Sequence, residues 1–337
     1  MNGRSAGPRS FNTLQRSNRE ARLRRLQEAR ILLLAICALI LLLALTGLVF
    51  LFCHIGHSVA GGGASGGSGK VVYTEIDISP TDESTRINLY TGELLLVNAD
   101  HPYHFPSIRI EDMDDQQLSQ YAITTYRTTV GDHYPFYVLP KQKNYYMLPT
   151  AAKAMSQFLT SHYNKTDESL LLSEGYQPES KQSGSNYDQL TGLSANIMKD
   201  QGEKLAADSL SKLLQECANY GFIQRFPSNK AAVTGVGNQT GVFRYVGVPH
   251  AKYMSANGLT LEEYIDLLKK DYADAHLLLD GNGAVAERAK DARYEIYYVK
   301  ATDGTMRISV PQNYKYTISG DNVGGFIVTV DLNSPVG

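Results

Sequence analysis

The longest apolar run in the chain is Ile31–Cys53, 23 residues without a charged side chain. At 1.5 Å per residue, a helix of this length crosses a hydrocarbon core of roughly 30 Å. A cleaved signal peptide has a shorter apolar region of about 7–15 residues and ends at a small-residue site. Ser58-Val59-Ala60 matches such a site only weakly. The pattern therefore predicts an uncleaved transmembrane helix over 31–53, with a cleaved signal peptide as the alternative.

The charges on the two sides of this span differ in sign. Residues 1–30 carry eight arginines against two glutamates, so the positive-inside rule keeps the N-terminus cytoplasmic and exports the rest. Removing these from 32 Lys+Arg and 34 Asp+Glu leaves 24 and 32, a net charge of −8 beyond the span. An acidic exported part argues against a nucleic-acid partner, because such binding depends on neutralising phosphates. We expect a single-pass protein of the cell membrane.

The segment that follows the span predicts a flexible tether and a domain without disulfides. Gly61–Gly69 is composed of Gly, Ser and Ala, which gives a flexible linker over 54–70. Past the edge of the span at Cys53, the sequence holds one cysteine, Cys217, so no intramolecular disulfide can form there. A domain of this size can fold by core burial alone. Export without disulfides fits a Gram-positive-type bacterium.

Beyond residue 70 the apolar spacing alternates between helical and extended patterns. Apolar residues at helical intervals predict helices over 151–163 and 205–220, the second ending at Gly221. The capping box Thr260-Leu-Glu-Glu263 begins a third helix. Short apolar runs between turn-forming residues predict strands. These strands are expected at Glu93–Asn98, Ser169–Leu172, Gly192–Ile197 and Phe243–Gly247.

The last part of the chain changes to alternating, strand-like patterns. Tyr294–Val299, Arg307–Val310 and Gly325–Val330 have extended character, the last after a Gly- and Asn-containing turn region. The sequence therefore predicts an α+β fold with a β-rich C-terminal extension, carried on one N-terminal transmembrane helix. The predicted organisation is a cytoplasmic basic tail over 1–30, the span over 31–53, the linker over 54–70, a main domain over 71–290 and the extension over 291–337.

Several blocks of the main domain resemble those of one enzyme family. Tyr220–Pro227, Thr234-Gly235, Phe243–Gly247 and Gly258–Tyr264 occur in the order and at the spacing found in VanY-type D-Ala-D-Ala carboxypeptidases. These are zinc peptidases that trim peptidoglycan stem peptides. The resemblance covers about residues 90–270 and implies a small antiparallel sheet with flanking helices. Further matching segments are Leu96-Val97-Asn98, His101-Pro102, Ser173-Glu-Gly-Tyr176 and Thr191-Gly-Leu193.

The resemblance also implies where the zinc site would lie, and those positions are all substituted. In the family, a His-x6-Asp motif gives two zinc ligands, and these positions fall on Gln189 and Asn196. A later Glu-x-x-His gives the general base and the third ligand, and these fall on Gln239 and Val242. The arginine that would pair with the substrate's terminal carboxylate falls on Gln177. Valine cannot ligate zinc, and neutral amides are poor ligands and poor bases.

The sequence therefore predicts a D-Ala-D-Ala carboxypeptidase-like protein without catalytic residues and without a cofactor. We expect a pseudoenzyme that binds peptidoglycan stem peptide or a wall-associated protein. Its ligand-binding cleft would be lined by the amides of Gln177, Gln189, Asn196 and Gln239. Loss of all function in an unused cleft explains the same substitutions equally well.

Two alternatives stay open at the level of sequence. The first is an active peptidoglycan carboxypeptidase with a rearranged zinc site. Asp188 would take the first ligand position if Leu190 is an insertion, with help from His162 or His250. His250 lies in a Val-Pro-His stretch that is expected at the surface. The second alternative is a scaffold whose tether and C-terminal extension contact a partner.

Overall fold

The computed structural model describes residues 70–104, 110–139, 145–176, 187–199, 202–237 and 239–336. The predicted tail, transmembrane span and most of the linker lie outside the described residues, as does Gln177. In the ranges just given, no helix is both long and apolar enough to cross a membrane. The compact unit described below is the one that spans 64–337.

A five-stranded sheet forms the centre of the peptidase-like region. Its strand order is β2-β3-β4-β6-β5, and all neighbours are antiparallel except β2 and β3, which are parallel. The mixed α+β class is therefore confirmed, whereas the expectation of a wholly antiparallel sheet is wrong at the β2 edge. The bounds are β2 Phe136–Val138, β3 Leu170–Glu174, β4 Ser194–Lys199, β5 Phe222–Gln224 and β6 Val242–Tyr245.

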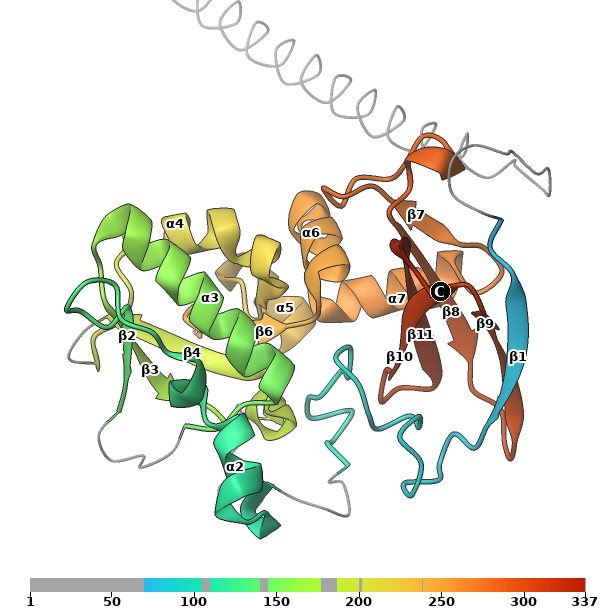
Figure 1. Ribbon diagram of the computed structural model, residues 1–337, viewed down its shortest axis with the longest axis horizontal. Helices are drawn as coiled ribbons and strands as arrows, with labels where there is room; N and C mark the ends of the chain where they lie inside the picture. The colour runs from blue at the N-terminus through green and yellow to red at the C-terminus, as the bar shows by residue number, and fades with distance from the viewer. Residues whose placement is uncertain are drawn as a thin grey trace, which may run out of the picture. The chain divides into compact units, whose positions relative to one another are not determined.

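Two of the predicted helices cover one face of this sheet. Helix α3, Pro149–Thr166, crosses it (Figure 1), and Phe158 packs there against Phe222 and Phe243. Helix α4 follows as Ala207–Glu216, continues as one 3-10 turn and ends at Gly221 with φ +81°. A side chain at Gly221 would be strained there. Both predicted helices are confirmed.

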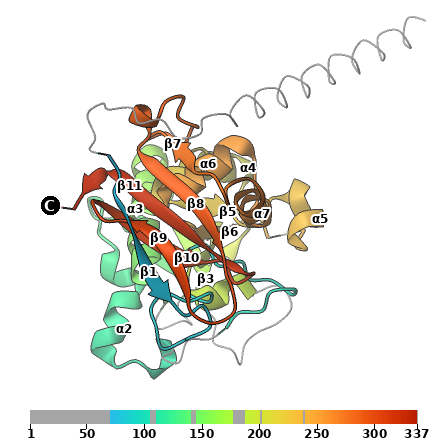
Figure 2. The ribbon, with the colours of Figure 1, turned by 90° about the vertical axis from the view of Figure 1, so that its right-hand side faces the viewer.

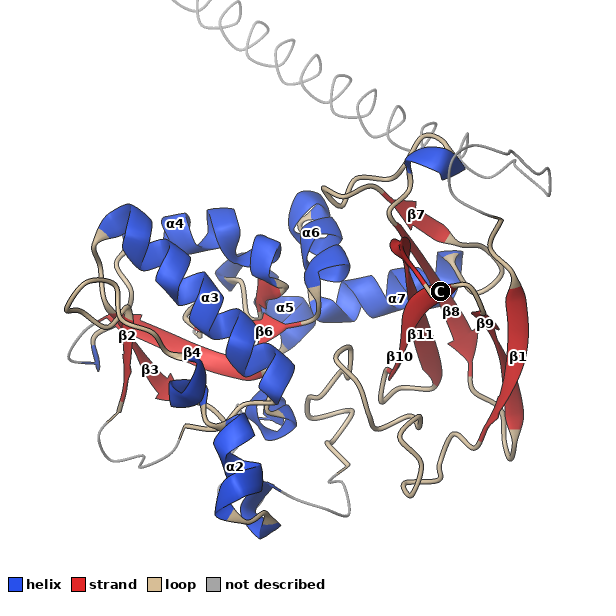
Figure 3. Ribbon diagram, in the orientation of Figure 1, coloured by secondary structure: helices blue, strands red, loops and turns tan. Residues whose placement is uncertain are grey.

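The remaining helices frame the sheet and lead to the C-terminal part. Thr260 caps α7 with the predicted reciprocal bonds to Glu263, which confirms the capping box. Figure 3 shows helices around the five-stranded sheet and a strand-rich region beyond α7. The helices are α2 Asp115–Tyr121, α5 Ala231–Thr234, α6 Val248–Asn257 and α7 Leu261–Asp271. The 3-10 turns are η1 Ile110–Asp112, η2 Ile123–Tyr126, η4 Tyr187–Thr191, η6 Cys217–Tyr220, η7 Ser228–Lys230 and η8 Ala289–Asp291.

The C-terminal strands form a second sheet, of order β10-β11-β8-β7, and a separate β1-β9 ribbon (Figure 2). One core cluster joins α6 and α7 to this sheet through Leu268, Ile296 and Ile327. The strands β7 and β1 precede residue 291, so the expected extension is paired with segments of the main domain; the predicted boundaries stay predictions. The bounds are β1 Tyr73–Ile78, β7 Leu277–Leu279, β8 Tyr294–Lys300, β9 Met306–Pro311, β10 Tyr314–Gly320 and β11 Gly325–Pro335.

One predicted strand is not a strand. Leu94–Val97 is buried, as its apolar composition requires, but it pairs with no strand. Its backbone is held by single bonds instead: the Leu96 amide donates to the Asp321 carbonyl at 3.0 Å. The Arg244 guanidinium donates to the Leu95 carbonyl at 2.9 Å. Burial of an apolar run therefore did not require a strand here.

Candidate functional site

Two of the positions that the resemblance assigns to zinc ligands lie opposite one another on neighbouring strands. Asn196 on β4 is the direct antiparallel partner of Val242 on β6. Glu174, the last residue of β3, is the partner of Asn196 on the other side. We call Glu174, Asn196 and Val242 the cross-strand row. Direct partners in an antiparallel sheet present their side chains on the same face, so the row forms one stripe across three strands.

The cross-strand row lies on the sheet face opposite the α3 core. The neighbours Ala195 and Phe243 belong to the core cluster that contains α3. Side chains alternate between faces along a strand, which turns Asn196 and Val242 the other way. Asn196 is half-buried, whereas Val242 is buried. The amide oxygen of Asn196 lies close to Gly241: a Cβ atom added at Gly241 would stand 2.8 Å from Asn196 Oδ1.

Gln189 reaches the cross-strand row from the 3-10 turn η4. Its Nε2 donates a hydrogen bond to Glu174 Oε2 at 2.9 Å. Its Oε1 is buried and has no hydrogen-bond partner among the residues that the structure describes. The structure thus brings Gln189, Asn196 and Val242 together, although they come from two blocks that lie about 50 residues apart in the sequence. Neither Gln189 nor Asn196 bears a negative charge, so the charge of this cluster comes from Glu174.

The residue before Gln189 anchors η4 to the sheet. Asp188 is buried, and its Oδ1 accepts from Arg225 Nε at 3.0 Å and from Arg244 Nη1 at 2.7 Å. Its Oδ2 accepts from the Ser194 hydroxyl. Burial opposes ionisation of Asp188, but the charges of Arg244 and Arg225 outweigh it and hold the pKa of this carboxyl below its usual value.

The two arginines extend this contact to other parts of the domain. Arg225 forms a bidentate pair with Glu262 on α7, at 3.0 and 2.7 Å. Arg244 donates to the carbonyls of Glu93 and Leu95. We call Asp188, Arg225 and Arg244 the ion-pair cluster. It fixes η4, and with it Gln189, against the sheet.

The side chains of the row do not fit a zinc ion. A catalytic zinc needs three strong protein ligands and an open position. Val242 offers no donor atom, Gln189 and Asn196 offer neutral amides, and Glu174 is a single carboxylate. In the described part of the chain, no group of three His, Cys, Asp or Glu side chains is placed to hold a metal. The absence of a cofactor itself stays a prediction.

The side chains proposed for a rearranged zinc site do not gather at the row. Asp188 is already shared between two arginines and Ser194. His250, expected at the surface, is buried: one ring nitrogen lies 2.7 Å from Tyr264 Oη and the other 2.9 Å from Thr329 Oγ1. Its surface location is therefore a wrong prediction, because β11 covers this side of α6.

His162 occupies a different environment again. It is buried on α3, with Nε2 3.3 Å from Glu168 Oε2 and Nδ1 3.7 Å from Glu216 Oε1. The helix α3 covers the sheet face opposite the row. His162 is therefore separated from the cross-strand row by the sheet itself, which removes it as a ligand at that site.

The last predicted cleft residue, Gln239, lies in the turn that enters β6. Its carbonyl accepts from the Val242 amide at 3.1 Å, and its side chain is half-buried. This turn places Gln239 three residues from the row, as the Glu-x-x-His spacing requires. Together with the undescribed Gln177, it leaves the amide-lined cleft a prediction.

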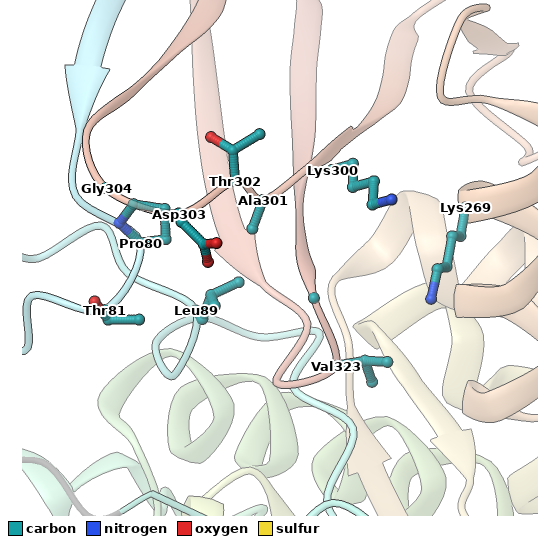
Figure 4. A pocket seen from close by; sticks show the side chains of 11 residues that line it. Pro80, Thr81, Leu89, Lys269, Lys300, Ala301, Thr302, Asp303, Gly304 and Val323 are labelled. Carbon is teal, nitrogen blue, oxygen red and sulfur yellow. The ribbon is translucent and has the colours of Figure 1, made fainter.

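A surface pocket of about 350 Å³ lies elsewhere, against the C-terminal sheet. Lys269 of α7 and Lys300 at the end of β8 reach toward it from two sides, with Asp303 nearby (Figure 4). The described cleft residues Gln189, Asn196 and Gln239 do not line this pocket.

The sequence pattern assigns Glu174 no role. The family's strand end reads Ser-Gly-Tyr-Arg, whereas in this chain Glu174 stands between Ser173 and the Gly175-Tyr176 pair. In the structure, the pairing register shifts between Leu172 and Glu174. The extra residue is the signal that could have identified Glu174, because a bulge redirects a side chain.

Comparisons with known proteins agree with this architecture, although no family model matches the chain. A D-alanyl-D-alanine carboxypeptidase of Enterococcus faecium is 28% identical over 263 residues, 73% of this chain and 77% of that protein. The bifunctional D-Ala-D-Ala dipeptidase and carboxypeptidase VanXYC of Enterococcus gallinarum is 47% identical over 55 residues, 16% of this chain and 29% of its own length.

The solved structure of the vancomycin resistance D,D-dipeptidase VanXYg, in complex with a D-Ala-D-Ala phosphinate analog, has the same fold. The match has a TM-score of 0.58 at 24% identity and covers 77% of this chain and 99% of that one. The fold is thus that of the VanX- and VanY-type peptidases. The relatives and the structural neighbour to which the chain is similar are thus VanY- and VanX-type D-Ala-D-Ala peptidases.

Proposed function

We propose that the domain binds peptidoglycan stem peptides and does not cleave them by the zinc chemistry of its relatives. One observation carries this proposal: the cross-strand row places Asn196 opposite Val242, with Gln189 beside Glu174, where three zinc ligands are needed. The supporting scaffold is intact, because Asp188 remains fully bonded next to Gln189. The molecule thus retains the shape of the family while lacking the donors for the metal.

The location belongs to the same proposal. We infer that the span over 31–53 holds the domain at the outer face of the cell membrane, where a tether of Gly and Ser lets it sample the nearby wall. The ligand would then be the stem peptide itself, whose D-Ala-D-Ala end is the ligand class named for the relatives.

The first experiment measures metal content and cleavage in the same sample. Residues 70–337 are loaded with zinc, dialysed extensively and analysed for bound zinc, and D-alanine release from Nα,Nε-diacetyl-L-Lys-D-Ala-D-Ala is followed. We expect no retained zinc and no release, while a zinc-dependent relative prepared in the same way gives both. Near-stoichiometric zinc with D-alanine release would overturn the proposal.

Binding is measured separately, because a vestigial domain would also fail to cleave. Isothermal titration with purified stem-peptide fragments is expected to give saturable binding by the zinc-free domain. Absence of binding to all fragments would leave a scaffold role and reject the proposed function.

A further inference from the structure

The β3 strand ends in a bulge that carries a carboxylate into the cross-strand row. Leu170, Leu171 and Leu172 pair in sequence with Lys199, Met198 and Ile197, and the shift after Leu172 then makes Glu174 the partner of Asn196. A bulge inserts one residue and turns the following side chains. Without this extra residue, the position opposite Asn196 would not be held by Glu174.

Glu174 has no positive partner in the ranges that the structure describes. Its contact is the amide of Gln189, and it is half-buried rather than sealed in the core. An ionised carboxylate only accepts hydrogen bonds, so Gln189 presents its NH2 group to Glu174 and points its carbonyl oxygen elsewhere. That oxygen is buried and unpartnered. The row therefore offers acceptors and one negative charge that no described cation balances.

The negative charge of Glu174 affects the neighbouring Tyr145 hydroxyl. Burial, and then the negative charge of Glu174, raise the pKa of the Tyr145 hydroxyl, which bonds the Glu174 carbonyl. The resemblance to the family implies an arginine that pairs with the ligand's carboxylate, and in this sequence its position falls on Gln177, outside the described residues. The sequence thus lacks that fixed positive charge, whereas Glu174 supplies a negative one.

We propose that Glu174 binds a primary ammonium group of the ligand, with Gln189 as the residue that positions the carboxylate. This inference rests on the proposed function and deepens it, because it names the chemical group that is recognised. An ammonium has three N–H donors and no acceptor, which matches the two acceptor oxygens of the half-buried Glu174 carboxylate. It occupies the region in which relatives would place a cationic metal. A stem peptide with a free amine on its diamino residue has this chemistry.

Three peptides of the same backbone test the group that is recognised. They are Nα-acetyl-L-Lys-D-Ala-D-Ala, with a free side-chain amine; Nε-acetyl-L-Lys-D-Ala-D-Ala, with a free terminal amine; and the diacetylated peptide, with neither. We expect the wild-type domain to bind one of the amine-bearing peptides at least 10-fold more tightly than the diacetylated one. The preferred peptide identifies whether the side-chain or the terminal amine is bound.

Matched substitutions assign this preference to one carboxylate. Glu174→Gln keeps the shape and removes the charge, and it is expected to reduce the ratio between amine-bearing and diacetylated peptides to about one. Glu75→Gln is the control, because Glu75 is exposed on β1 and pairs with Arg307. It should leave the ratio unchanged. Equal binding of all three peptides by the wild type, or an unchanged ratio in Glu174→Gln, would overturn the inference.

Gln189 is tested by the same ratio. Gln189→Met removes the hydrogen bond to Glu174, and we expect it to lower the binding of the amine-bearing peptide several-fold more than the binding of the diacetylated peptide. A purely structural role would weaken all peptides alike and would contradict the positioning role. If the folded wild-type domain binds none of the three peptides, the proposed function fails and this inference fails with it, which distinguishes that outcome from loss of selectivity.

Discussion

Two consecutive residues of η4, Asp188 and Gln189, face the same sheet but differ in how many hydrogen bonds their side chains form. Asp188 uses both carboxylate oxygens in the ion-pair cluster with Arg225 and Arg244 and the Ser194 hydroxyl. The Gln189 side chain makes one hydrogen bond, to Glu174, and its amide oxygen has no partner among the described residues. The difference separates residues that stabilise the domain from residues at positions assigned to a chemical reaction. Asp188 supports the structure of the domain through charged contacts, whereas the Gln189 side chain is held by one hydrogen bond at a position that the family resemblance assigns to a zinc ligand.

The physical reason lies in the cost of failure. Removing one partner from a buried ion pair leaves an uncompensated charge, at about 3–5 kcal/mol, a large part of a domain's stability. Replacing a zinc ligand by an amide costs the chemistry but leaves a neutral side chain that strands no charge. We therefore expect the ion-pair cluster to tolerate substitution less well than the positions that the resemblance assigns to zinc ligands.

The largest expected effect is the return of a metal site. If the cross-strand row preserves the geometry of the family, then Gln189→His, Asn196→Asp and Val242→His together supply three strong ligands on one face. We expect the triple variant to retain about one zinc per molecule after dialysis, against none for the wild type, by elemental analysis. The control is the double variant with Val242 unchanged, which lacks one ligand. A triple variant that folds but retains no zinc would show that the row has lost the geometry as well as the donors.

The next effect tests the other side of the comparison. Arg244 is fully buried in the ion-pair cluster, so Arg244→Met leaves Asp188 with one arginine and releases three backbone carbonyls. We expect a loss of about 3–5 kcal/mol in the free energy of unfolding, measured by urea denaturation. Arg307→Met is the control, because Arg307 is exposed and its pairs with Glu75 and Asp77 lie at the surface. It should not shift the midpoint measurably. Comparable losses in the two variants would contradict the special role of the cluster.

Local patterns predicted the parts of the fold that depend on neighbouring residues. Helix spacing and helix caps involve residues only a few positions apart. They therefore predicted the helix over 151–163, the end of the next helix at Gly221 and the Thr260 capping box. The ion-pair cluster was not, since Asp188 meets partners 37 and 56 residues away. Periodicity carries no information on such pairs.

The wrong predictions likewise concern contacts between residues that lie far apart in the sequence. The burial of His250 depends on Thr329, which lies 79 residues further along the chain and belongs to a strand that covers α6. The segment 94–97 is as apolar as a strand, yet Arg244 and Asp321 hold its backbone from distant parts of the chain. The role of Glu174 escaped prediction because one added residue changes a register, and register is a property of two strands.

The smallest of the three effects is a pH dependence at His250, which joins the peptidase-like region to the C-terminal sheet. Burial lowers the pKa of His250 to about 3 from its usual 6.5. The folded protein therefore binds fewer protons than the unfolded chain between these values, and its stability falls as the pH decreases from about 7 toward 3. From pH 7 to pH 5 this one group contributes a loss of about 2 kcal/mol.

His250→Gln isolates this term, because glutamine can still bond Tyr264 and Thr329 but does not titrate. Urea midpoints at pH 7 and pH 5 should therefore differ less in the variant than in the wild type, by about 2 kcal/mol once converted to free energy. His133→Gln is the control, since His133 is exposed and should leave the difference unchanged. An identical pH dependence in His250→Gln and the wild type would contradict this prediction. It would show that His250 binds a proton as readily in the folded protein as in the unfolded chain, and that the contact between the two sheets tolerates the charge. Of the two buried contacts tested, the ion-pair cluster and the His250 contact, the stability of the ion-pair cluster alone would then depend on the charges of its side chains.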